Sequence, residues 1–118
     1  MIGNVDLFGG IRTLASETDG TATTFYSDVF NVGGGVSGDV LLTVYQMFAG
    51  TGGTFDVTIE HSHDLTTWAT LASFTQATGA TSESEALASF SQYIRAKCVL
   101  DGTTALVTFK LKGVIRAD

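Results

Sequence analysis

Residues 54–74, TFDVTIEHSHDLTTWATLASF, carry the clearest fold signal in this sequence. From Phe55 to Ser62, apolar or aromatic residues alternate with polar ones, which is the period of a strand with one buried face. The segment Ser62–Thr67 then reads as a turn, because Asp64 and the threonine hydroxyls can bond their own backbone. A second strand follows and carries Trp68, the only tryptophan. The stretch therefore predicts a β-hairpin with a large aromatic anchor.

The remaining chain repeats this arrangement of short strands and turns. Asp101-Gly102 lies between the last two apolar segments and is a strong hairpin signal. The sequence has no proline, and no long segment keeps a 3.6-residue period. Further strands are predicted at 22–32, 40–48, 91–100 and 105–115, and residues 85–90 fit either a short strand or a helical turn. Seven or eight short strands predict an all-β fold, an antiparallel β-sandwich of jelly-roll or immunoglobulin-like type.

The length of 118 residues predicts a single domain, 1–118, with residues 1–20 as an N-terminal arm or an edge strand. Charged residues make up only 15% of the chain, below the roughly 25% that is usual, so we expect surface hidden against partners. The net charge of −6 argues against binding to nucleic acid or to an anionic membrane. No signal peptide or membrane-spanning segment is recognised, and a single cysteine excludes an internal disulfide, so we expect folding in the cytosol.

The predicted strand at residues 40–48 is apolar on both faces. One face carries Val40, Leu42, Val44 and Phe48, and the other carries Leu41, Tyr45 and Met47. Such a strand has one face in its own core and the other covered by a loop or by another subunit. In the second hairpin strand, a bulge between Trp68 and Leu71 would let both side chains point inward.

Basic residues are concentrated near the end of the sequence. Only Arg12 precedes position 95, against ten acidic residues. If the last two strands form a hairpin, four basic residues share its outward face: Arg95, Lys97, Lys110 and Lys112. This basic strip could dock onto an acidic surface, including that of a neighbouring copy. The favoured interpretation is cross-strand pairing with Asp56 and Glu60, at about 0.2–1 kcal/mol per pair.

Candidates for catalysis or metal binding are sparse. His61 and His63 could share a metal, but a closed site needs about four ligands, so a strand end entering a polar turn is favoured. Glu83 and Glu85 form the only plausible carboxylate pair, on a loop poorly suited to raising a pKa. No serine lies in a nucleophile elbow, and the absence of any lysine before Lys97 excludes a phosphate-binding P-loop. We expect a protein that is not an enzyme and that needs no cofactor or metal.

Four aromatic residues could form a sugar-stacking platform, as in carbohydrate-binding modules built on β-sandwiches: Tyr26, Tyr45, Trp68 and Tyr93. A single tryptophan in a small sandwich is usually the anchor between the sheets, so Trp68 is predicted to lie in the core. Tyr45 and Tyr93 point away from the main apolar set of their strands, and we expect them on the surface or in an interface.

Three segments resemble small β-sandwich structural proteins of tailed bacteriophages, which include head decoration or cement proteins. They are residues 55–75 (FDVTIEHSHDLTTWATLASFT), 90–97 (FSQYIRAK) and 103–109 (TTALVTF). The shared pattern is a strand, a Ser-x-Asp-Gly-x-x-Trp turn and a final Tyr-x-Arg-x-Lys strand paired in a hairpin. Here Leu65 stands where glycine is usual. The resemblance covers the second half of the chain, and the same turn also occurs in carbohydrate-binding and fibronectin-like modules.

The resemblance implies a virion protein, made in the host cytoplasm, that binds the outside of an icosahedral capsid. Its partners would be the major capsid protein and its own copies, commonly as a homotrimer, with no nucleic acid or membrane partner. A tail or fibre component and a carbohydrate-binding module are the alternatives. Three regions are expected to make assembly contacts, namely the N-terminal arm, the doubly apolar strand and the last hairpin. The contact candidates are Ile2, Val5, Leu7, Phe8, Ile11, Leu14, Leu41, Tyr45, Met47, Tyr93, Arg95, Lys97, Lys110 and Lys112.

Overall fold

A computed structural model of the chain describes residues 2–16, 22–33, 35–48 and 50–116, and all of its regular elements are strands. None of these residues belongs to a helix that could cross a membrane. The strands are β1 (Ile2–Asp6), β2 (Arg12–Ala15), β3 (Thr23–Tyr26), β4 (Phe30–Asn31), β5 (Gly35–Phe48), β6 (Thr51–Ser62), β7 (Ala69–Ser73), β8 (Thr81–Phe90), β9 (Tyr93–Thr103) and β10 (Leu106–Arg116).

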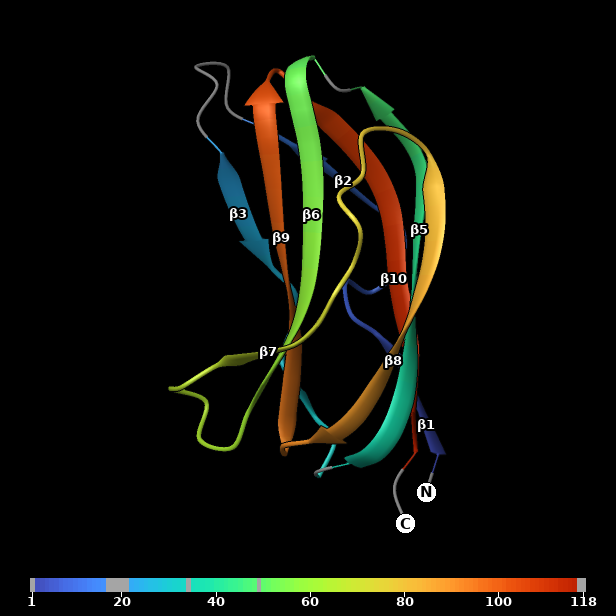
Figure 1. Ribbon diagram of the computed structural model, residues 1–118, viewed down its shortest axis with the longest axis vertical. Helices are drawn as coiled ribbons and strands as arrows, with labels where there is room; N and C mark the ends of the chain where they lie inside the picture. The colour runs from blue at the N-terminus through green and yellow to red at the C-terminus, as the bar shows by residue number, and fades with distance from the viewer. Residues whose placement is uncertain (1, 17–21, 34, 49, 117–118) are drawn as a thin grey trace.

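The strands form two antiparallel sheets of five strands that face each other (Figure 1). Sheet A has the order β1-β10-β5-β8, with β2 also paired to β10. Sheet B has the order β3-β9-β6-β7, with β4 also paired to β9. Because β1 and β2 share one position and β3 and β4 another, the fold has the eight-strand layout of a jelly roll. The predicted β-sandwich is confirmed, and the jelly roll is the correct one of the two alternatives.

The core lies between the sheets and follows the predicted alternation along β6. Phe55, Val57 and Ile59 are at most 1% exposed, because each points from β6 toward sheet A. The ring of Phe109 on β10 meets the ring of Phe55 at a centroid distance of 5.0 Å and the ring of Phe8 at 5.1 Å. These aromatic contacts join both sheets and the N-terminal segment in one apolar cluster.

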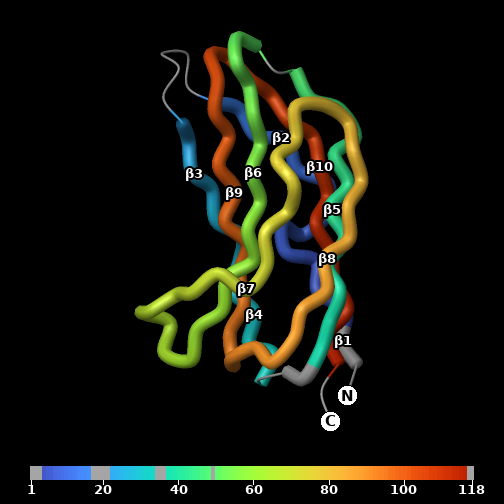
Figure 2. The backbone as a smooth tube through the Cα atoms, in the orientation of Figure 1, coloured from blue at the N-terminus to red at the C-terminus, as the bar shows by residue number. Residues whose placement is uncertain are grey.

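The N-terminal segment is an edge of sheet A and not an arm. β1 and β2 both lie along β10. In Figure 2, β1 and β2 are the blue segments beside the red strand β10. Four of the contact candidates are buried in the core of their own chain, each at most 8% exposed: Val5, Leu7, Phe8 and Leu14. Of the two alternatives predicted for this region, an arm or an edge strand, the edge strand is the correct one for β1 and β2.

A β-bulge in β5 changes which side chains face outward. Val44 is opposite Phe109 and Gln46 is opposite Thr108, so Tyr45 is the extra residue. Beyond the bulge the alternation is reversed. Met47, one of the contact candidates, packs against the core, and Phe48, expected on the same face as Val44, is 62% exposed.

The last two strands do not form a hairpin, because β9 belongs to sheet B and β10 to sheet A. The chain crosses between the sheets with Gly102 at φ 114° and Thr104 at φ 57°. The Ser16 hydroxyl stabilises this crossing by donating to the Gly102 carbonyl (2.8 Å) and accepting from the Ala105 amide (2.8 Å). Residues with positive φ occur both in hairpin turns and in connections between sheets. The Asp101-Gly102 signal therefore could not distinguish a hairpin from a crossing.

The ambiguous segment 85–90 is the second half of the edge strand β8. Glu83 points to the inner side of β8, and both of its carboxylate oxygens accept from the Thr75 amide at 3.1 Å. An inward-pointing charge on an edge strand hinders pairing with a further strand. The open edge of β8 is therefore a poor docking site.

Candidate assembly surfaces

The outer face of sheet A exposes three large apolar side chains near one end of β5 and β10. Phe48 is 62% exposed and lies directly opposite Leu106, which is 43% exposed. Tyr45, the bulge residue, is 49% exposed on the same face. We call Tyr45, Phe48 and Leu106 the apolar patch. Clustered apolar side chains of this size on a small domain usually mark a surface that a partner covers.

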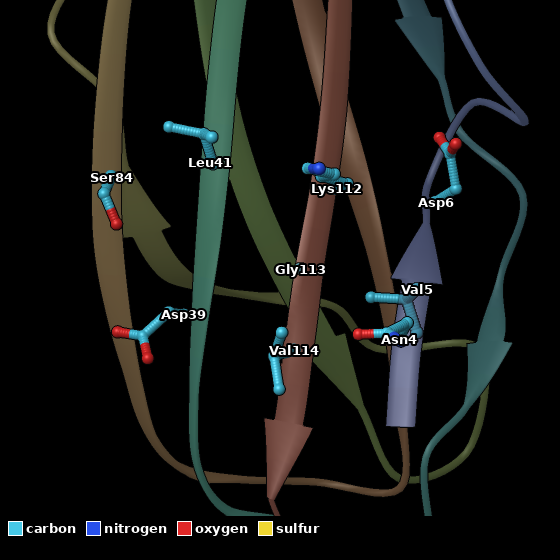
Figure 3. A pocket seen from close by; sticks show the side chains of 9 residues that line it. All are labelled: Asn4, Val5, Asp6, Asp39, Leu41, Ser84, Lys112, Gly113 and Val114. Carbon is cyan, nitrogen blue, oxygen red and sulfur yellow. The ribbon is translucent and has the colours of Figure 1, made fainter. Parts of the chain in front are cut away.

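A groove occupies the other end of the same face (Figure 3). It has a volume of about 550 Å³ and lies across β1, β10, β5 and β8. Leu41 and Val114 provide apolar surface, and Asp39, Lys112 and Ser84 provide polar groups around it. Concave surfaces with apolar walls and a few polar groups are suited to receiving side chains of a ligand or partner.

Charge on this face differs from charge on the rest of the molecule. The outward residues of β1, β5, β8 and β10 include three basic side chains, Lys110, Lys112 and Arg116, and two acidic ones, Asp6 and Asp39. Arg116 pairs with Asp39, whereas neither lysine has a carboxylate within 4 Å among the described residues. The face therefore has a formal charge of +1 on a chain of −6.

The outer face of sheet B is organised around Arg95. Its guanidinium carbon lies 4.1 Å from the centroid of Trp68 and 4.2 Å from that of Tyr26. Its Nε donates to the Glu60 carboxylate at 2.9 Å, and Glu60 is directly opposite Arg95 in the β6–β9 pair. Two aromatic rings and one carboxylate therefore hold the guanidinium in place.

Trp68 is thus an outward residue, and its prediction as the core anchor is wrong. The predicted bulge is present nearby. Glu60 is opposite Thr70 and Ile59 is opposite Ala72, which leaves Leu71 as the extra residue. Leu71 packs against the core, but the bulge lies beyond Trp68 in the chain and does not turn the indole inward.

The turn between β6 and β7 is rigid and projects from the sandwich (Figure 1). Asp64 Oδ1 accepts from the amides of Thr66 and Thr67 and from the Ser62 hydroxyl, each at 2.9 Å. Leu65 has φ 66°, which explains why glycine is usual at this position in the resembling proteins. The Leu65 side chain is 51% exposed at the projecting end.

Hydrogen bonds from the Thr67 and Thr66 amides, followed by that from Ser62, lower the pKa of Asp64 from 3.8 to about 2. Because the folded-state pKa is below the unfolded value, this stabilisation is complete above pH 3.8 and is lost as the pH falls toward 2. We therefore expect the stability difference between the wild type and Asp64→Asn to shrink over that range in urea denaturation. A difference that does not change between pH 5 and pH 2 would contradict this assignment.

The histidines and the cysteine singled out in the sequence lie apart from one another in different surroundings. His61 Nδ1 accepts from the Ser91 amide at 3.0 Å, so this nitrogen is occupied, and His63 lies 3.9 Å from Asp64 at the exposed turn. No group of three or more metal-ligating side chains occurs in the part of the chain that the structure describes. Cys98 is fully buried, and burial raises the pKa of its thiol.

The predicted basic strip is divided between opposite sides of the molecule. Arg95 and Lys97 lie on sheet B, and Lys110 and Lys112 lie on sheet A, because β9 and β10 are in different sheets. The pairing of Arg95 with Glu60 is confirmed, whereas Asp56 accepts from the Gln76 side chain at 3.1 and 3.2 Å.

The remaining contact candidates are scattered. Ile11 is 60% exposed beside β2, Leu41 lies in the groove, Tyr45 in the apolar patch, and Tyr93 is half-buried on sheet B. The side chain of Ile2 lies outside the described residues. Sequence reasoning missed Phe48, Leu106 and Val114 as surface residues. Strict alternation from Ala105 to Ile115 already places Leu106 and Val114 outward. The outward position of Phe48 depends on the bulge at Tyr45, and no residue type in this part of the sequence indicates a bulge.

No protein-family model matches the sequence, and no curated protein matches it significantly. Solved structures match the fold. A chain of infectious bursal disease virus, Gx strain, has a TM-score of 0.64 and 10% identity over 98% of this chain, which spans 33% of the viral chain. A Bacillus endospore appendage, described as a disulfide-linked pilus, has a TM-score of 0.53 and 19% identity, with 99% of this chain and 89% of that chain covered.

The module TmCBM61, solved with β-1,4-galactotriose, also has a TM-score of 0.53, at 7% identity, with 98% of this chain and 88% of that chain covered. At these identities the likeness concerns the fold alone. The chain is therefore a β-sandwich of the kind found in virus structures, in a pilus and in a carbohydrate-binding module, and its role has to be argued from its own surfaces.

Proposed function

We propose that the chain is a virion structural protein of the capsid decoration class. It binds the major capsid protein on the outer surface of an icosahedral phage head and stabilises the shell through contacts between protein surfaces. The apolar patch on the outer face of sheet A carries this proposal. A chain with only 15% charged residues and with Phe48 62% exposed has surface that only assembly would remove from water.

A decoration protein needs a contact with the shell as well as contacts among its copies. The β6–β7 turn is suited to the shell contact, because it projects from the sandwich and its hydrogen bonds hold it rigid. Leu65 presents an apolar side chain there that is 51% exposed. A rigid projecting turn loses little conformational entropy on binding, which favours affinity.

The test is co-sedimentation of the purified chain with undecorated heads of the phage that encodes it. We expect saturable binding and a higher temperature of DNA release from decorated heads. Leu65→Asn should reduce the number of copies bound severalfold, and it leaves the fold intact because asparagine tolerates a positive φ. Absence of binding at about 10 µM chain would overturn the proposal.

A carbohydrate-binding role is the second candidate, favoured by the outward position of Trp68 and Tyr26 on sheet B. Since Trp68 is the only tryptophan, its fluorescence reports on this surface directly. For a decoration protein we expect no change in the emission when β-1,4-galactotriose or a panel of plant and bacterial glycans is added. A saturable change with any of them would favour the carbohydrate-binding alternative.

A further inference from the structure

We propose that two copies of this chain pair through the outer faces of sheet A, with their strands antiparallel, so that the apolar patch of each copy enters the groove of the other. This deepens the proposed function by naming a second copy as the occupant of one surface. The pair itself forms with or without a capsid.

The relative positions of patch and groove carry the geometry. Both lie on β5 and β10, and Leu41 in the groove is seven residues from Phe48 in the patch, or about 23 Å along the strand. When two such faces meet head to tail, a single two-fold axis makes the same contact twice. This arrangement places Leu106 over the partner's Val114 and Tyr45 over the partner's Leu41.

The size of the face is adequate for a stable pair. Four strand positions about 4.8 Å apart and the 11 residues of β10 at about 3.3 Å each give a face of roughly 700 Å². Stable protein interfaces bury about 800 Å² on each partner. Face-to-face packing of twisted sheets is also how the two layers of the sandwich itself associate.

Charge is compatible with a second copy on this face. The outer face of sheet A has three basic and two acidic side chains, a formal charge of +1. Because the whole chain has a formal charge of −6, all its other residues together carry −7. This face is close to neutral, so two copies that meet through it keep the acidic remainder of each molecule out of the contact.

The midpoint between patch and groove is the row of Thr43 and Lys110, which are opposite each other in the β5–β10 pair. On the proposed axis each of these residues meets its own counterpart. The two Lys110 side chains therefore repel each other and weaken the pair. Removing this charge should strengthen the association between the two copies. A substitution that only destabilised the fold would not increase this affinity.

Sedimentation equilibrium over a range of chain concentrations tests the pair. We expect a monomer–dimer equilibrium whose Kd rises at least about tenfold in Leu106→Thr and in Phe48→Thr, both of which suit a strand. Lys110→Gln should lower the Kd about two- to fivefold. The matched control is Leu65→Asn, which removes a leucine of similar exposure from the β6–β7 turn and should leave the Kd unchanged.

Cysteine trapping tests the axis directly. Facing residues of two packed sheets lie about 10 Å apart, beyond the reach of a disulfide, so the probe is a short bis-maleimide cross-linker. It should link two chains of Thr43→Cys, whereas Thr58→Cys, a half-buried outward threonine on sheet B, should remain monomeric. Native Cys98 does not interfere, because it is buried and its thiol pKa is raised. A monomer at several hundred micromolar, a trimer, or failure of Thr43→Cys to cross-link would each overturn the pair. None of these outcomes bears on head binding, which co-sedimentation decides separately.

Discussion

Phe109→Ala should lower the free energy of unfolding by about 3–5 kcal/mol. Phe109 is fully buried on the central strand β10 and contacts the rings of Phe8 and Phe55. Its removal leaves a cavity where three parts of the chain meet, because the antiparallel sheets around it cannot collapse to fill the space. Urea denaturation monitored by circular dichroism measures the loss.

The control for this substitution is Phe48→Ala at a concentration where the chain is monomeric. Phe48 is 62% exposed, so the same change of side chain should alter the stability of the monomer by less than about 0.5 kcal/mol. Equal losses from the two substitutions would show that the inward and outward assignments on β5 and β10 are wrong.

Arg95→Met should cost about 2–3 kcal/mol. The substitution removes the guanidinium from between Trp68 and Tyr26, and it leaves the Glu60 side chain, which is only 13% exposed, without its partner. Because the pair is only partly buried, the expected cost is below that of a fully buried ion pair. The emission spectrum of Trp68 should shift at the same time, since the cation beside the indole is lost.

The double variant Glu60→Leu with Arg95→Met separates the two causes. If the unpaired carboxylate dominates the cost, the double variant should recover most of the lost stability. Lys97→Met is the matched control, because Lys97 lies on the same face of β9 and has no carboxylate within 4 Å in the described structure. A double variant as unstable as Arg95→Met would assign the loss to the aromatic contacts instead.

The sequence predicted the architecture where one physical rule acted alone. Along β6 the alternation from Phe55 to Ile59 placed every inward side chain correctly. In a strand with one buried face, only one orientation puts the apolar side chains in the core. The fold class followed from the number of such segments. The same rule indicated Arg95 and Glu60 as outward cross-strand neighbours, and these residues form the ion pair.

Prediction failed where two different structures are compatible with the same local sequence pattern. Asp101-Gly102 fits a hairpin as well as a crossing between sheets, and only the tertiary pairing of β10 with β5 decides between them. Tyr45 and Leu71 are bulge residues, and a bulge reverses the facing of every residue after it. The bulge at Tyr45 turns Phe48 outward, so this member of the apolar patch could be recognised only in the folded structure, whereas the outward positions of Tyr45 and Leu106 follow from strand alternation.

The pairing of β1 and β2 with β10 has a consequence for how the chain folds. Ile2 is opposite Arg116 and Leu14 is opposite Val107, so neither β1 nor β2 has its partner strand until β10 has been synthesised. Sheet A cannot close before that point. Folding dominated by such distant pairings is slow, on the order of milliseconds to seconds for sandwiches of this size, and it depends on a late event. Until β10 is in place, Leu7 and Phe8 lack the strand beside which they are buried, and exposed apolar residues of this kind favour aggregation.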